Sequence, residues 1–188
     1  MNKFGTAALA ALLIVGGVGS AAFAQDSMGS MHDPMVGGAA MYPSKNIIQN
    51  AVNSKDHTTL VALVKQAGLV QTLEGPGPFT VFAPTNEAFA KLPKATVDKV
   101  TGDKALLTKV LTYHVVAGRL SAADIVQKIK DGGGTAKIKT VEGDDITASL
   151  DGSSVIITDD HGDKAKVTIA DVNQSNGVIH VIDTVLVP

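Results

Sequence analysis

Methionine thioethers and one imidazole form the most distinctive group of reactive side chains in this sequence. Met28, Met31, His32 and Met35 lie close together near the N-terminus. Thioether sulfur and imidazole nitrogen suit copper(I), so these residues are a candidate copper site. In the alternative interpretation they belong to a flexible linker, where methionine is oxidation-prone but idle. Because ligands without fixed geometry are weak evidence for a site, we favour the linker and expect no cofactor, with copper as the exception.

Catalytic residue patterns are missing from the sequence. The chain has no cysteine, no Gly-x-Ser-x-Gly nucleophile elbow and no His-Glu-x-x-His metal pair. Its five histidines lack metal-ligand spacing among themselves. We therefore expect a protein that is not an enzyme.

An acidic loop from Asp159 to Asp163 has the residue types of a calcium site, because carboxylates surround a glycine. An EF-hand loop that began at Asp159 would end on a glutamate at position 170, which is Ala170 here. We interpret the loop as a solvated hairpin turn.

Two polar residues interrupt the apolar C-terminal segment. Residues 178–187 are apolar on both alternating faces, which is typical of a central, buried strand. His180 and Asp183 fall on opposite faces of such a strand, so they cannot form one site together. We expect a structural hydrogen bond for each of them.

The first 24 residues have the features of a secretory signal peptide. Lys3 provides the positive start, residues 7–18 form an apolar run too short to span a bilayer comfortably, and residues 22–24 have the small-x-small cleavage pattern. Cleavage between Ala24 and Gln25 would give a secreted or periplasmic protein without membrane insertion after signal removal. Without cysteines, its core must be stable in the absence of disulfides.

Charge excludes two classes of partner. The formal net charge is −2 and the lysines are scattered, which provides no electrostatic footprint for nucleic acid. The chain also lacks a basic amphipathic face for anionic lipid. We therefore expect a protein, a polysaccharide or a small ligand as partner.

The rest of the chain divides into a spacer and one folded domain. Residues 25–43 are rich in Met and Gly without helical or strand periodicity, which predicts a disordered tail. Residues 44–188 have helical patterns in their first half and short strands in their second, which predicts an α+β fold with mostly antiparallel pairing. The strands are expected at residues 80–83, 136–141, 146–150, 155–158, 166–170 and 178–187.

Three segments of this domain together resemble one known family. They are Gly77–Pro93, with three phenylalanines and a strand that stops at Pro84, Leu111–Gly118, and Asn176–Pro188. In this order and at this spacing they resemble the fasciclin domain, a secreted adhesion and matrix module. The resemblance implies a wedge-like β-sandwich with a layer of short helices. It also implies adhesion to a cell-surface or matrix protein or polysaccharide, with self-association as a further mode.

The resemblance also points to partner-binding residues. It implicates the pair Tyr113 and His114, together with Asp124 and Ile125. The alternative is that His114 is a core histidine bonded to backbone, Tyr113 packs its ring, Ile125 is core, and Asp124 stabilises the first turn of a helix. Competing functions are carriage of a small apolar ligand or soft metal, and a structural role in the cell envelope.

Overall fold

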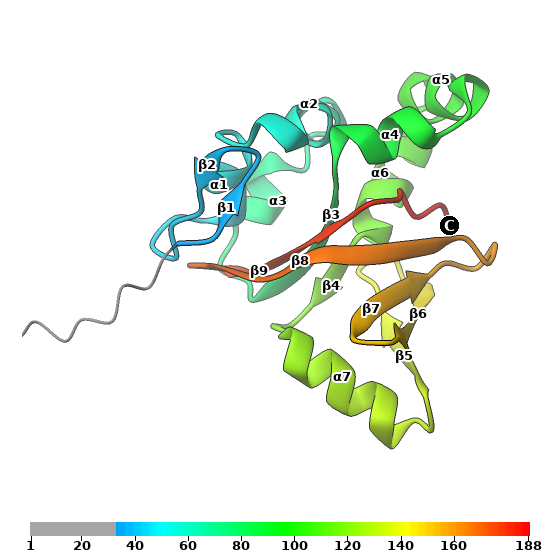
Figure 1. The fold of residues 1–188 in the computed structure, drawn as a ribbon. Helices are drawn as coiled ribbons and strands as arrows, with labels where there is room; N and C mark the ends of the chain where they lie inside the picture. The colour runs from blue at the N-terminus through cyan, green and yellow to red at the C-terminus, as the bar shows by residue number, and fades with distance from the viewer. Residues whose placement is uncertain (1–32) are drawn as a thin grey trace, which may run out of the picture. The chain divides into compact units, whose positions relative to one another are not determined.

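The described part of the chain, residues 33–188 of a computed structural model, is built around one mixed sheet (Figure 1). The seven strands follow the order β4-β3-β9-β8-β7-β6-β5. Neighbouring strands pair antiparallel, except β3 and β9, which run parallel. The strands are β3 (Phe79–Pro84), β4 (Val115–Ala117), β5 (Thr135–Lys139), β6 (Asp145–Asp151), β7 (Ser154–Thr158), β8 (Lys164–Gln174) and β9 (Gly177–Ile182).

The two edges of this sheet meet. The backbone N–H of Val141, just after β5, donates to the carbonyl of Val115 in β4 at 2.7 Å. The sheet therefore curls almost into a barrel, as expected for strongly twisted strands. The predicted α+β class with mostly antiparallel pairing is confirmed.

Short helices cover the sheet, and several begin at side-chain caps. The Thr85 hydroxyl accepts from the amide of Ala88, and Asp103 caps the helix that follows it, which satisfies otherwise unpaired amides. Figure 1 shows α7 below the sheet and apart from the helices above it. The helices are α1 (Ile47–Ala51), α2 (Thr58–Ala67), α3 (Val70–Glu74), α4 (Asn86–Lys91), α5 (Lys94–Gly102), α6 (Lys104–Tyr113) and α7 (Ala122–Asp131), with a 3-10 turn, η1 (Lys55–His57).

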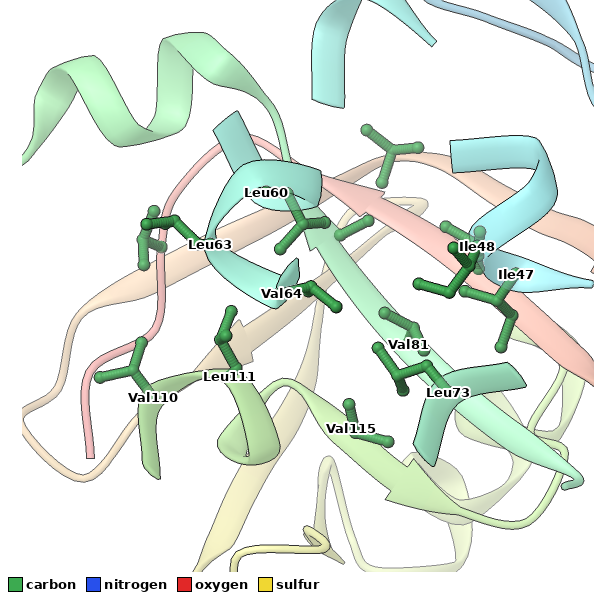
Figure 2. Close-up of a cluster of buried hydrophobic side chains, with 14 of the residues drawn as sticks. Ile47, Ile48, Leu60, Leu63, Val64, Leu73, Val81, Val110, Leu111 and Val115 are labelled. Atoms are coloured by element: carbon green, nitrogen blue, oxygen red, sulfur yellow. The ribbon is translucent and has the colours of Figure 1, made fainter. Parts of the chain in front are cut away.

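Two hydrophobic cores stabilise the domain. The first core lies between the sheet and helices α1, α2, α3 and α6, where Val64, Leu73, Val81, Leu111 and Val115 pack together (Figure 2). The second core lies between α7 and the strands from β5 to β9. The helices of the first half thus bury one apolar face each against the sheet.

A hairpin at the start of the described region corrects one prediction. Strands β1 (Met35–Val36) and β2 (Ala39–Ala40) pair antiparallel, and Val36 and Met41 are buried in the first core. The expectation of a disordered tail over 25–43 is therefore wrong for residues 33–43. Isolated apolar residues between glycines have no periodicity, so the contacts that order them were not visible in the sequence.

Gly37 is the turn residue that allows this hairpin to approach η1. Its φ is +59°, and an added Cβ would meet the backbone amides of Lys55 and Asp56 at 2.8 and 2.6 Å. Its carbonyl accepts from the Lys55 amide at 3.2 Å. Glycine is required here because both the conformation and the space exclude a side chain.

Candidate partner-binding site

His114, at the end of α6, is a buried structural residue. Its Nδ1–H donates to the Val110 carbonyl at 2.8 Å, and its Nε2 accepts from the backbone amide of Leu186 at 3.0 Å. The ring is neutral in this arrangement, because one nitrogen donates and the other accepts. Burial lowers the pKa of the imidazole to about 4. His114 therefore fastens the C-terminal segment to α6.

Tyr113 and Ile125 lie in the second core. The Tyr113 ring is fully buried and its hydroxyl donates to the Asp145 carbonyl at 3.4 Å. Burial, and then the nearby Asp160 carboxylate, raises the pKa of the phenol to about 12. The Ile125 side chain is also buried. Direct partner contact by these two residues and by His114 is thus excluded in this conformation, and the alternative interpretation as core residues is confirmed.

Asp124 is the exposed member of the predicted set. It forms a capping box at the start of α7, where its Oδ2 accepts from the Ser121 amide at 2.9 Å and from the Ser121 hydroxyl at 2.7 Å. The bond from the Ser121 hydroxyl, followed by the bond from its amide, lowers the pKa of the carboxyl. The predicted stabilisation of the first helical turn by Asp124 is confirmed, and its position on the surface leaves it available to a partner.

A strained residue in β8 lies beside this helix start. Asp171 has φ +57° at a bulge in the pairing of β8 with β9, a conformation that is sparsely populated outside glycine. Its Oδ1 accepts from the Ala122 amide, the first of α7, at 2.7 Å. Backbone strain of this kind gathers at functional sites, so Asp171 is a candidate the sequence analysis missed.

The buried His180 supports Asp171 through a hydrogen bond to its backbone amide. The Asp171 amide donates to His180 Nδ1 at 3.3 Å, and His180 Nε2–H donates to the Leu120 carbonyl at 2.8 Å. The ring stacks on Phe82 with centroids 5.6 Å apart, and burial lowers the pKa of its imidazole. The predicted structural role of His180 is confirmed, and that role includes supporting the strained bulge.

Arg119 completes the exposed polar groups at this end of the domain. Its guanidinium donates to the Asn173 side chain at 3.0 Å and to the Gln174 carbonyl at 2.8 Å. These bonds hold an exposed arginine in one orientation against β8. We call the exposed residues Arg119, Asp124, Asp171 and Asn173 the α7 surface.

The α7 surface presents fixed charges of both signs. One oxygen of Asp124 and one of Asp171 accept the bonds described above, and the other oxygen of each has no hydrogen bond within residues 33–188. Fixed carboxylates and a guanidinium suit charge-assisted hydrogen bonds to a partner. In the sequence Asp171 and Asn173 lie between the strands expected at 166–170 and 178–187, and the only signal was that Asp and Asn tolerate positive φ.

The acidic loop between β7 and β8 is a hairpin turn, but it is not fully solvated. Asp159 is buried, and its Oδ1 accepts from the amides of His161 and Asp163 at 3.0 and 2.9 Å. Its Oδ2 accepts from the Val187 amide at 3.0 Å. The expectation of a solvated loop was wrong for Asp159, because a sequence pattern does not reveal backbone donors from the C-terminus.

Asp183 also has the structural role predicted for it. Its Oδ1 accepts from the Lys166 amide at 2.9 Å and from the Thr184 hydroxyl at 3.0 Å. Among residues 33–188, no group of three His, Cys, Asp or Glu residues is placed to hold a metal ion.

The candidate soft-metal ligands lie mostly beyond the described region. Met28, Met31 and His32 are outside it, as are the signal peptide and the cleavage site between Ala24 and Gln25. Met35 lies in β1 with half of its surface exposed. The copper site and the signal cleavage therefore stay predictions. Between residues 33 and 188, none of the helices has the length and apolar character needed to cross a membrane.

Sequence comparison relates this chain to a known family. The fasciclin domain matches residues 55–188. Protein sll1483 of Synechocystis sp. is 41% identical over 156 residues, which cover 82% of this chain and 79% of the relative. Immunogenic protein MPB70 of Mycobacterium bovis is 39% identical over 143 residues, covering 73% and 66%. Cell surface glycolipoprotein MPB83 of the same species is 35% identical over 160 residues, covering 85% and 63%.

The fold is shared with a solved structure. A FAS1 domain pair from the insect cell adhesion molecule Fasciclin I superposes with a TM-score of 0.66 at 19% identity, over 77% of this chain and 51% of that one. This chain belongs to the fasciclin domain family. The resemblance inferred from three sequence segments is thereby confirmed. One relative is named a cell surface glycolipoprotein, and the solved structure that shares the fold comes from a cell adhesion molecule.

Proposed function

We propose that this protein is an extracytoplasmic, non-enzymatic adhesion module that binds a cell-surface or matrix partner through the α7 surface. The observation that carries the proposal is the strained, exposed Asp171, fixed between the first amide of α7 and the buried His180. Membership of a family with adhesion-type members supports the class of function.

The chemistry of the α7 surface favours a polar partner. Its charged groups are held in place before binding by bonds within the protein, so little side-chain entropy is lost when a partner docks. Exposed carboxylates beside an arginine match a protein or polysaccharide that offers both cations and hydroxyl or carboxyl oxygens. Such recognition requires no apolar patch on this end of the domain.

Attachment assays with two matched double variants test this proposal. Asp124→Asn with Asp171→Asn removes two charges while both side chains keep an oxygen for the caps of α7. The control, Asp98→Asn with Asp151→Asn, removes two charges from exposed carboxylates of α5 and β6. Each protein is expressed in the native host from which the gene has been deleted, and cell–cell and surface attachment are measured.

The α7 variant should reduce attachment several-fold, while the control variant should restore the level of the unaltered protein. Equal loss in both variants would assign the effect to net charge and overturn the α7 surface as the site. Full attachment by the α7 variant would also overturn it. Attachment unaffected by deletion of the gene would reject the adhesion function itself.

A further inference from the structure

An apolar cavity lies inside the first core. It has a volume of about 60 Å³ and is bounded by helices α1, α2 and α3, by strands β3, β4 and β9, and by the N-terminal hairpin. Figure 2 shows several of the side chains around it, among them Ile48, Val64, Leu73, Val81 and Val115. Well-packed cores contain few voids larger than a water molecule, which makes this one a candidate binding site.

All polar side chains along the cavity wall except that of Thr72 are hydrogen-bonded within the protein. His57 Nδ1 is 2.9 Å from the Ser54 hydroxyl and its Nε2 is 3.4 Å from the Ala83 carbonyl. The Thr112 hydroxyl donates to the Thr108 carbonyl at 2.8 Å, and both nitrogens of His114 are bonded as described above. A water molecule needs two to four polar partners, and the exposed Thr72 hydroxyl is the one side-chain group of this wall without a hydrogen bond in the described part of the chain. The cavity therefore suits an apolar occupant.

Two residues of the cavity wall are exposed at the protein surface. Thr72 of α3 is exposed, and Val141 after β5 is 44% exposed. The next residue, Glu142, lies 3.8 Å from the Lys109 ammonium, which is 3.6 Å from Asp144. One cation between two carboxylates leaves this rim with a net negative charge, which disfavours an anionic head group.

We propose that this cavity binds the end of a neutral, unbranched alkyl chain, which enters between Thr72 and Val141. The cavity is less than half the size of the ~150 Å³ apolar cavity that holds benzene, so it accommodates a few carbon atoms in a slender arrangement. The negative rim disfavours the carboxylate of a fatty acid relative to an alcohol or an ester. This assignment is independent of adhesion through the α7 surface.

Methyl-resolved NMR of the full-length chain tests the proposal with 1-pentanol and pentanoate. We expect 1-pentanol to shift the methyl signals of Val64, Val81 and Ile179, which line the cavity. Pentanoate at pH 7 should need at least a several-fold higher concentration. Equal affinity for 1-pentanol and pentanoate would overturn the preference for a neutral head group. Shifts spread evenly over both cores would overturn the location of the binding site in the first core.

Two double variants, each with enlarged side chains in one of the two cores, test where 1-pentanol binds. Val64→Ile with Val115→Ile adds a methylene at two positions of the cavity wall, and should abolish the pentanol shifts. Val116→Ile with Val155→Ile adds the same groups to the second core and should leave them intact. Persistence of the shifts in the first variant would overturn the proposal.

Xenon provides a readout that needs no variant. Xenon enters dry apolar cavities, so under pressure it should shift the same three methyl groups in the unaltered chain. Added 1-pentanol should displace xenon, so that the xenon shifts give way to those seen with 1-pentanol alone. If xenon shifts none of these methyl groups, the proposal that the cavity is apolar and accessible is overturned. This result does not depend on whether the variants with enlarged side chains fold.

Discussion

Two buried histidines use the same hydrogen-bonding pattern in different places. His114 and His180 each donate one ring N–H to a backbone carbonyl and accept a backbone amide on the other nitrogen. The amide accepted by His114 belongs to the buried Leu186, whereas the amide accepted by His180 belongs to the exposed Asp171. The first histidine therefore serves the fold alone, and the second connects the core to a surface.

Acidification should have the largest effect, because it acts on His114 and His180 and also on the third buried histidine, His57, whose pKa burial likewise lowers. Burial places the pKa of His114 at about 4 and lowers that of His180, while the unfolded chain binds these protons below about pH 6.5. The free energy of unfolding should therefore fall as the pH drops from about 6.5 towards 4, by roughly 3 kcal/mol from His114 alone. Urea denaturation across this range measures the change, and a flat profile would contradict neutral buried histidines.

His114→Phe should be the most destabilising substitution that leaves attachment intact. It leaves the buried Leu186 amide without a partner, which should lower the free energy of unfolding by about 2 to 3 kcal/mol. Its urea profile should also depend less on pH than that of the unaltered protein. His161→Ala is the control: it removes an exposed hydrogen bond to the Val187 carbonyl and should change stability by less than about 1 kcal/mol. Loss of attachment by folded His114→Phe would break the distinction between the two histidines.

His180→Phe should lower stability and attachment together. The Asp171 amide and the Leu120 carbonyl both lose their partner, at an expected cost of about 2 kcal/mol, and the bulge is freed to relax. Attachment of the folded variant, measured at a temperature well below its unfolding midpoint, should fall several-fold. Normal attachment would show that the bulge does not depend on His180.

Substitutions at Asp171 distinguish the strain in its backbone from the cap that its side chain provides to α7. Alanine at φ +57° is less favourable than aspartate, and the Ala122 amide loses its cap, so stability should fall by about 1 to 2 kcal/mol. Asp171→Gly should recover part of this loss, since glycine adopts positive φ without strain. If glycine proved less stable than alanine, the conformation of residue 171 would not be strained.

Ser121→Ala should give the smallest effect. It removes the hydroxyl half of the capping box at α7 and should cost about 1 kcal/mol. Thermal unfolding is sufficient to measure it. Ser121→Thr retains a hydroxyl and should remain within a few tenths of a kcal/mol of the unaltered protein; an equal loss in both variants would contradict the capping role.

The sequence predicted the fold more completely than it predicted the residues of the α7 surface. Each strand expected in the second half, from 136–141 to 178–187, has a counterpart in the structure. The parallel pairing of β3 with β9 was not predicted, because it joins segments far apart in the chain. Residues 33–43 were misjudged because Val36 and Met41 are ordered by tertiary contacts with the first core rather than by a local pattern.

The candidate site was predicted only at Asp124. Its Ser-x-x-Asp spacing is a local signal, and local signals are visible in a sequence. Tyr113, His114 and Ile125 are distinctive residues, but their burial depends on how α6 and α7 pack on the sheet. Asp171 was missed because a single left-handed residue within a strand has no pattern of its own.

The contact between Val141 and Val115 has a consequence for behaviour at high concentration. An open sheet would offer the free amides and carbonyls of its edge strands to another molecule, which is a common route to aggregation. Here β4 and β5 lie against each other, and the exposed Lys137 and Lys139 line the outer strand. This contact shortens the free strand edge that copies of this protein crowded on a surface could use for edge-to-edge pairing.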